Sequence, residues 1–275
     1  MKPFLKWAGN KYRIVDKIRA LLPDGRRLIE PFAGAAAVFL NTAYESNVLN
    51  DINRDVILVY RVLQQMGPAF VDLCKALFTE DNNTPERYYA LREEFNDTSD
   101  LVRKAALFVY LNRHGYNGLC RYNHSGHFNV PFGRYKKPYF PFQEMMLFYE
   151  KAKTAVFRSD DFEVLMAEAQ PGDVIYCDPP YVPLSDTANF TSYSAGGFDV
   201  REQLRLAEAA RATAARGIPV LISNHLNDFT LSVYRGAEIH SFDVQRHISC
   251  DGANRTKAPE LLALFAGDCA RPMVR

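Results

Sequence analysis

The sequence has no apolar stretch long enough to cross a membrane, which takes about 20 consecutive apolar residues. Its first residues, MKPFLKWAGNK, also lack the apolar core of a signal peptide. Of the 275 residues, 48% are hydrophobic and 24% are charged, which is typical of a folded globular chain and excludes a disordered one. We therefore expect a cytoplasmic protein that does not associate with membranes.

Cysteine is scarce and irregularly placed. The five cysteines stand at positions 74, 120, 177, 250 and 269. No two of them form a CxxC pair, and an odd number of scattered cysteines favours a reducing compartment over disulfides or a zinc site. Three histidines, His114, His124 and His127, are irregularly spaced in an expected loop. We expect no bound metal.

Acidic residues are missing from one region, although the net charge of the whole chain is only +1. Residues 101–143 contain no Asp or Glu, and their charged residues are Arg103, Lys104, Arg113, Arg121, Arg134, Lys136 and Lys137. Many aromatic residues lie between them. Phe108 and Tyr110 follow helical spacing and are expected in the core, whereas Tyr116 lies in a glycine-bounded loop. Basic and aromatic side chains together indicate a nucleic-acid surface, because a merely solvated face does not explain the missing acids.

The rest of the chain alternates between expected strands and helices. Strands are expected at 28–29, 48–49, 154–158, 173–178 and 218–223, with two last antiparallel strands in 236–244 and 261–266. Helices are expected at 12–22, 143–153, 161–169 and 199–216, and residues 54–112 contain only helical patterns, at 54–66, 68–79, 85–95 and 100–112. This alternation predicts an α/β fold with a mostly parallel sheet, helices on both faces, and a helical insert over about residues 54–144.

Ligands of open α/β sheets bind at the carboxyl ends of the strands, where two motifs of this chain fall. EPFAGAAAVFL (30–40) follows the first strand, and Gly34 allows the backbone to approach a ligand closely. Asp51 follows the second strand, where dinucleotide-binding folds bond a ribose. An N-cap for the helix near Asn53 is the alternative. Because the turn and the acid occur together, we favour the ribose role.

A third strand end reads VIYCDPPY (174–181). Asp178 and the carbonyl of Pro179 accept hydrogen bonds, while Pro179 and Pro180 have no N–H to compete. Tyr181 offers a face for stacking. Two converging acceptors suit a planar NH₂ group, and bonding both of its hydrogens frees the nitrogen lone pair for attack. Cys177 is expected to point into the core.

Taken together, these motifs resemble the adenine-N6 DNA methyltransferases of the alpha class. The matching stretches are FLKWAGNK (4–11), EPFAGAAAVFL, NDIN (50–53) and DPPY (178–181). LNRHGYNGLCRYN (111–123) and FNVPFGRYKKPYFP (128–141) are similar to the Dam-type enzymes, which methylate adenine in GATC. The resemblance implies a Rossmann-like methyltransferase fold with a catalytic, S-adenosylmethionine-binding domain over residues 1–53 and 145–275. Residues 54–144 would form the DNA target-recognition domain.

The resemblance also implies roles for individual residues. The catalytic set is Asp178, Pro179, Pro180 and Tyr181. The cofactor, S-adenosylmethionine with S-adenosylhomocysteine as its product, is contacted by Trp7, Ala8, Gly9, Lys11, Phe32, Gly34, Asp51, Asp161, Phe162 and Asp178. The DNA set is Lys6, Arg113, Tyr116, Asn117, Leu119, Arg121, Pro131 and Arg134, with Arg255 and Lys257 as further phosphate contacts. For Asp161-Phe162, a helix cap followed by a core residue is the alternative.

Two positions depart from the family pattern. Asn10 stands in AGNK where the family commonly shows AGGK, and Ala36 stands at the second glycine of FxGxG. Asn tolerates left-handed backbone angles. Ala36 is expected to adopt ordinary angles.

The resulting prediction is a bacterial or phage enzyme, monomeric and nucleoid-associated, that methylates N6 of an adenine flipped out of double-stranded DNA. GATC is the expected recognition sequence. The same chemistry at another sequence, in a restriction-modification or phage enzyme, is the first alternative. A catalytically silent DNA-binding protein and an RNA or protein amine methyltransferase are the others. Intact Asp178 and Asp51 disfavour the former, and Asp rather than Asn at 178 disfavours the latter.

Overall fold

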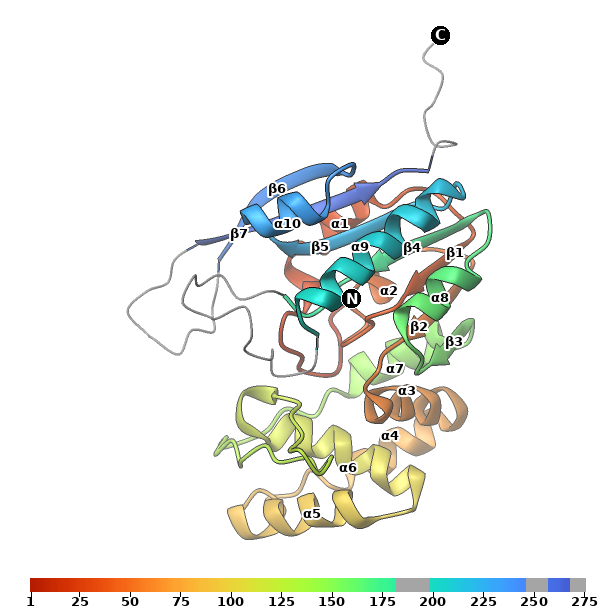
Figure 1. Cartoon of the computed structure of the whole chain (residues 1–275). Coiled ribbons are helices and arrows are strands. Elements are labelled where there is room, and N and C mark those ends of the chain that lie inside the picture. The colour runs from red at the N-terminus through yellow and green to blue at the C-terminus, as the bar shows by residue number, and fades with distance from the viewer. Residues whose placement is uncertain (182–197, 246–256, 268–275) are drawn as a thin grey trace. The chain divides into compact units, whose positions relative to one another are not determined.

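The structure is a computed structural model that describes residues 1–181, 198–245 and 257–267 (Figure 1). Its strands form a seven-stranded sheet in the order β3-β2-β1-β4-β5-β7-β6. The strands are β1 (Arg27–Glu30), β2 (Ser46–Asn50), β3 (Ala155–Arg158), β4 (Asp173–Cys177), β5 (Val220–His225), β6 (Glu238–Gln245) and β7 (Lys257–Phe265). Strand β4 pairs in parallel with β1 and β5, and β2 with β3, whereas β7 is antiparallel to β5 and β6. The expected α/β, Rossmann-like class is confirmed.

The helices fall close to the expected segments. They are η1 (Lys11–Ile14), α1 (Val15–Leu21), α2 (Ala37–Asn41), α3 (Arg54–Met66), α4 (Pro68–Lys75), α5 (Pro85–Asp97), α6 (Leu101–His114), η2 (Tyr116–Gly118), α7 (Phe142–Ala152), α8 (Phe162–Glu168), α9 (Val200–Ala215) and α10 (Asp228–Val233). Helix α10 was not expected from the sequence. A capping box between Asn227 and Thr230 starts it. None of the helices within the described residues is long and apolar enough to cross a membrane.

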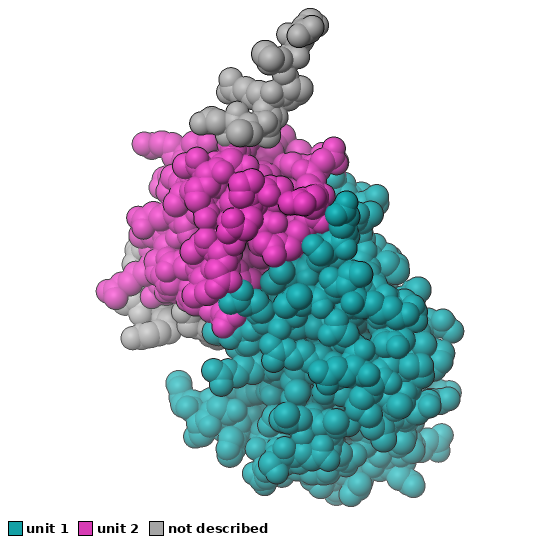
Figure 2. Space-filling model, turned by 90° about the vertical axis from the view of Figure 1, so that its right-hand side faces the viewer, with its two compact units in different colours: residues 1–19, 33–159 teal, residues 20–32, 160–275 magenta. Residues whose placement is uncertain are grey.

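The chain divides into two compact units (Figure 2). Unit 1 comprises residues 1–19 and 33–159, and unit 2 comprises residues 20–32 and 160–275. The predicted recognition domain, residues 54–144, lies wholly within unit 1. Its separation from residues 1–53 as a domain stays a prediction.

Unit 1 is built around a buried aromatic group. Tyr60 of α3 stacks on Phe148 of α7 with 4.7 Å between ring centroids, and Phe4 meets both rings edge-on. The Asn112 side chain of α6 accepts from the Lys6 backbone N–H at 2.8 Å and donates to the Lys6 carbonyl at 2.7 Å. This pair of bonds ties the N-terminal segment to α6. The expectation that Phe108 and Tyr110 belong to the core is confirmed.

In unit 2, β4 lies between β1 and β5. All five β4 residues are buried, as expected of a strand covered on both faces. Cys177 is fully buried, which confirms that its side chain points into the core. Helix α9 packs on β5 and β7 and also contacts α8. Asp199 starts α9 by accepting from the N–H groups of Arg201 and Glu202 at 2.8 and 3.1 Å.

Candidate active site

In unit 1, the turn after β1 packs directly against the single tryptophan. Gly34 has a φ of +46°, and a Cβ on it would lie 2.8 Å from Nε1 of Trp7. Glycine suits this position, because a Cβ would be strained by the backbone angle and would collide with the Trp7 ring. The hydroxyl of the buried Tyr60 donates a hydrogen bond to the Gly34 carbonyl. Trp7 and Gly34, both predicted cofactor residues, therefore lie together.

Asp51 fixes this turn to the start of α3. Its Oδ2 accepts from the Gly34 N–H at 2.9 Å, and its Oδ1 accepts from the Asn53 N–H at 2.9 Å. Asn53, rather than Asp51, caps α3, by accepting from the N–H groups of Asp55 and Val56. Burial raises the pKa of Asp51, and the two backbone donors oppose that rise. The carboxylate is thus held in one orientation at the carboxyl end of β2.

The segment Ala8–Lys11 forms a short loop leading into η1. Lys11 is buried, and its Nζ donates to the Gly9 carbonyl at 2.6 Å. Ala8 and Gly9 are exposed. Asn10 has a φ of −51° and caps η1 by accepting from the Tyr12 N–H. Asn10 is therefore not in the left-handed region, and Gly9, with a φ of +75°, takes that role.

Ala36 departs from the expectation made for it. It adopts left-handed angles, φ 57° and ψ 36°, at the N-cap of α2, so the prediction of ordinary angles is wrong. The cause is a tight turn in which the Ala36 N–H donates to the Ala33 carbonyl at 2.6 Å while the Ala36 carbonyl accepts from Leu40 at 3.1 Å. This conformation costs a residue with a Cβ about 1–2 kcal/mol, which a glycine would avoid.

In unit 2, three aromatic rings gather near the start of α8. Phe32 and Phe162 lie 5.5 Å apart between ring centroids, and Phe198 meets Phe32 edge-on at 5.4 Å. Phe32 and Phe162 were predicted cofactor residues, and Phe198 was not. Asp161 caps α8 by accepting from the Glu163 N–H at 2.9 Å. Phe162 is buried, so the alternative of cap plus core also describes this pair.

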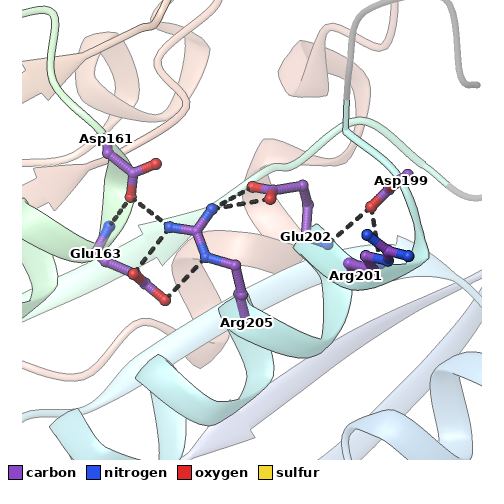
Figure 3. Close-up of polar contacts among 6 residues, drawn as sticks. All are labelled: Asp161, Glu163, Asp199, Arg201, Glu202 and Arg205. Atoms are coloured by element: carbon purple, nitrogen blue, oxygen red, sulfur yellow. Dashed lines mark hydrogen bonds and ion pairs between the residues drawn. The ribbon is translucent and has the colours of Figure 1, made fainter.

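One arginine holds the start of α8 (Figure 3). Arg205 of α9 directs its guanidinium at three carboxylates: Glu163 at 2.8 and 3.2 Å, Asp161 at 3.0 Å, and Glu202 at 2.7 and 2.8 Å. Its guanidinium carbon also lies 4.9 Å from the centre of the Phe162 ring. Because these groups are partly exposed, the pairs contribute little to stability. Their effect is to fix Asp161 and Phe162 in position.

The DPPY corner, residues 178–181, follows β4. Hydrogen bonds from residues that were not predicted from the sequence hold it in place. Ser223 of β5 donates to Oδ1 of Asp178 at 2.8 Å, and Gln203 of α9 donates to the Pro180 carbonyl at 2.7 Å. The Tyr181 ring meets the ring of His225 edge-on at 4.5 Å. A signal existed, because Ser223 and His225 stand at the carboxyl end of an expected strand. The corner presents a carboxylate and an aromatic face, a combination that can bind a flat amine.

Comparison with known proteins decides the family. The sequence profile of the D12 class N6 adenine-specific DNA methyltransferases matches residues 7–248. The chain belongs to this family. It is 49% identical over 271 residues to a DNA adenine methylase of Escherichia coli (strain K12), covering 98% of each chain. It is 51% identical over 265 residues to a DNA adenine methylase of Vibrio cholerae serotype O1 (strain ATCC 39315 / El Tor Inaba N16961), covering 96% of each chain.

The family confirms the predicted reaction class, enzymatic methylation of adenine N6 in DNA. Methyltransferases of this kind use S-adenosylmethionine as the methyl donor in general. Each unit, taken by itself, contains side chains whose chemical type suits such a molecule. Unit 1 offers a fixed carboxylate, Asp51, beside a glycine turn, and unit 2 offers the aromatic pair Phe32 and Phe162. The described part of the chain has no group of three or more His, Cys, Asp or Glu that could hold a metal ion.

The eight residues of the predicted DNA set, from Lys6 to Arg134, lie in unit 1, whereas Lys257, predicted as a further phosphate contact, begins β7 in unit 2. Tyr116 is 51% exposed at the start of η2, in agreement with its expected loop position. Arg121 is exposed and bonded to Asn129, with Nε donating to Oδ1 at 2.8 Å and Nη2 donating to the backbone carbonyl at 3.1 Å. The Lys6 Nζ lies 4.2 Å from the centre of the Tyr135 ring.

The remaining members of the DNA set differ in exposure. Pro131 and Arg134 are exposed, and Asn117 is exposed with its backbone N–H donating to the Tyr135 hydroxyl at 3.0 Å. Leu119 is half-buried. Arg113 is buried and donates to the Phe4 carbonyl, and this burial lowers its pKa to about 10. A DNA contact from Arg113 stays a prediction. Arg255 lies outside the described residues.

Proposed function

We propose that this chain transfers a methyl group from S-adenosylmethionine to N6 of an adenine flipped out of double-stranded DNA, within GATC. The observation that carries the proposal is the Asp178 carboxylate, fixed by Ser223 at 2.8 Å at the end of β4 and followed by two prolines and an aromatic ring. The preference for GATC rests on the resemblance of residues 111–123 and 128–141 to the Dam-type enzymes.

The corner acts by placing acceptors. Asp178 and the Pro179 carbonyl accept hydrogen bonds from the two N–H groups of the adenine amine, while the ring stacks on Tyr181. These bonds favour an amine whose lone pair is free of conjugation with the ring. A bound cofactor would supply a sulfonium methyl: a C–N bond would form as the C–S bond breaks, S-adenosylhomocysteine would leave, and the amine would lose one proton to Asp178 or to water. Much of the acceleration comes from holding amine and methyl in line. The Pro180 carbonyl already accepts from Gln203, which supports Pro179 as the second acceptor.

The predicted cofactor residues are taken within each unit by itself. Asp51, fixed between Gly34 and Asn53, accepts from the ribose hydroxyls. Phe32 and Phe162 flank the adenine ring of the cofactor, with Asp161 beside it. The loop residues Trp7, Ala8, Gly9 and Lys11 close over the end that carries the carboxylate, and the buried Lys11 ammonium suits that charge.

The recognition segment, defined as residues 115–141, is assigned to the DNA. Tyr116 fills the place of the flipped adenine in the base stack, since it is exposed and flanked by glycine-rich backbone. Arg121 leaves Asn129 and bonds guanine in the major groove in a bidentate manner. Lys6, Asn117, Leu119, Pro131 and Arg134 complete the contacts. No acidic group in the segment opposes the phosphates.

Transfer of labelled methyl groups to plasmid DNA, followed by mapping of the modified bases, tests the proposal. We expect N6-methyladenine at GATC and no label in a plasmid that lacks GATC. Asp178→Ala should abolish the signal. Label at another sequence would show that GATC is the wrong recognition sequence, while the proposed reaction would stand. Normal labelling by Asp178→Ala would refute the role of the acceptor corner.

A further inference from the structure

A chain of two buried hydroxyl groups ends on the predicted catalytic carboxylate. The Tyr176 hydroxyl donates to Oγ of Ser223 at 3.1 Å, and Ser223 donates to Oδ1 of Asp178 at 2.8 Å. The sheet register explains the contact. Cys177 of β4 lies opposite Ile222 of β5 in a parallel pair, so the next residues along, Asp178 and Ser223, adjoin. Tyr176 and Asp178 share a strand face because side chains alternate.

The chemistry of the three groups makes this chain run in one direction. An ionised carboxylate can only accept, so the Ser223 hydroxyl must donate to Asp178. The Ser223 oxygen then has only its lone pairs for Tyr176, and the phenol must be the donor. Burial raises the pKa of Tyr176 well above its usual value, with the charge of Asp178 adding to the rise, so the phenol keeps its proton. Of the two acceptors in reach of the Ser223 hydroxyl, Oδ1 of Asp178 at 2.8 Å is closer than the Cys177 carbonyl at 3.4 Å.

The backbone of the corner is held independently of Ser223. Gln203, Asn224 and Tyr234 form a buried ring in which Oε1 of Gln203 accepts from both partners at 3.1 Å. The Gln203 amide is thereby oriented, and its Nε2 donates to the Pro180 carbonyl at 2.7 Å. Loss of the Ser223 hydroxyl therefore acts on the Asp178 side chain, because Pro180 keeps its own support.

We propose that Ser223 is a positioning residue for methyl transfer, which orients the Asp178 carboxylate toward the substrate amine through the chain Tyr176–Ser223–Asp178. This inference rests on the proposed function, in which Asp178 grips the adenine amine. Ser223 is buried and reaches one carboxylate oxygen from within the sheet. It acts through Asp178 and does not touch the substrate.

Ser223→Ala is the first test, measured as the single-turnover rate of methyl transfer to a GATC duplex. We expect that rate to fall on the order of 10- to 100-fold, as is typical for loss of a hydrogen bond to a charged acceptor. The KM for the duplex and the Kd for S-adenosylhomocysteine should change by less than about twofold, because Ser223 contacts neither. An unchanged single-turnover rate would overturn the inference.

Two further comparisons separate the hydroxyl from packing. Ser223→Thr and Ser223→Val have nearly the same shape, and only the former keeps a hydroxyl. We expect the Thr variant to be much faster than the Val variant, and equal rates would refute a role for the hydroxyl. Thr213→Val is the matched control, since it removes another buried hydroxyl of unit 2 that donates to the Met166 carbonyl at 3.5 Å. Its rate should equal that of the unmodified enzyme.

Asp178→Ala measured beside them separates the two proposals. If Asp178→Ala is inactive and Ser223→Ala is normal, the positioning role fails and the proposed function stands. If Asp178→Ala is itself active, the proposed function fails first.

Discussion

The catalytic corner and the recognition segment use their polar side chains in opposite ways. At the corner, residues 176–181, the supporting groups Ser223 and Gln203 are buried and each is bonded to a defined protein partner. In the recognition segment, Tyr116 and Arg121 are exposed, and Arg121 is bonded to its near neighbour Asn129. The groups assigned to chemistry are therefore oriented before substrate arrives, whereas the groups assigned to DNA must exchange one partner for another.

The comparison separates two kinds of mutational effect. Hydrogen-bond acceptors that are already oriented stabilise the transition state without having to move. Disturbing them should therefore lower the rate of methyl transfer at saturating DNA. Exposed basic groups act on association and on salt dependence, so removing them should weaken DNA binding and leave the rate of the bound complex intact. Each prediction below tests whether the two kinds of effect stay separate.

The largest effect is expected for Asp178→Asn. The substitution keeps the shape of the side chain but replaces one acceptor oxygen with an NH₂ group that donates and cannot accept. We expect the single-turnover rate to fall by about 10³-fold or more, in line with losses from removing one oriented group at an active site. Rapid quenching with labelled S-adenosylmethionine measures it.

DNA affinity of Asp178→Asn is the control for the comparison. The Kd for a GATC duplex, measured by fluorescence anisotropy, should stay within about threefold of that of the unmodified enzyme, because the substitution leaves unit 1 unchanged. A large loss of DNA binding would show that the corner also determines affinity for DNA. Effects on the rate and effects on binding could then not be assigned to different regions.

Sequence patterns predicted the fold well where apolar periodicity is strong. The run Val174–Cys177 reads as a buried strand and is one, and helices such as α3 begin and end at the expected residues. Helix α10 was not predicted, because a helix of six residues is too short to show a periodic pattern. Short helices are set by caps and by packing, which a sequence shows less clearly.

At the site, the sequence identified residues but not how they are held. Asp51 and Asp178 followed from the rule for strand ends, whereas Gly34 and Ser223, which donate to them, are 17 and 45 residues away in sequence. The contact between Ser223 and Asp178 depends on strand register, which pairs residues 45 apart in sequence. The left-handed Ala36 was missed for a related reason, since the backbone angles of the turn override the ordinary preference of alanine.

Arg121→Ala tests the recognition segment. If Arg121 bonds guanine, its removal should cost about 1–3 kcal/mol of discrimination, roughly 10- to 100-fold, between a GATC duplex and one with the guanine replaced. Competition binding with the two duplexes measures this ratio. The rate of the bound complex should change little.

Lys137→Ala is the matched control for Arg121→Ala, because Lys137 is an exposed basic residue of the same segment. Lys137→Ala should weaken binding to both duplexes equally. It should also reduce the slope of log affinity against log salt concentration by about one unit. If Arg121→Ala behaves in the same way, Arg121 contacts phosphate and its assignment to base reading is wrong.

The smallest effects come from a matched pair of tyrosine hydroxyls, one in each region. Tyr176→Phe removes the donor to Ser223 in the corner, and Tyr135→Phe removes the acceptor of the Asn117 N–H in the recognition segment. Both keep their rings, so each variant loses one hydrogen bond, worth about two- to tenfold. We expect Tyr176→Phe to lower the single-turnover rate without changing the Kd for DNA. We expect Tyr135→Phe to raise the Kd for DNA without changing the single-turnover rate. The same effect from both variants would contradict the separation of chemistry from recognition.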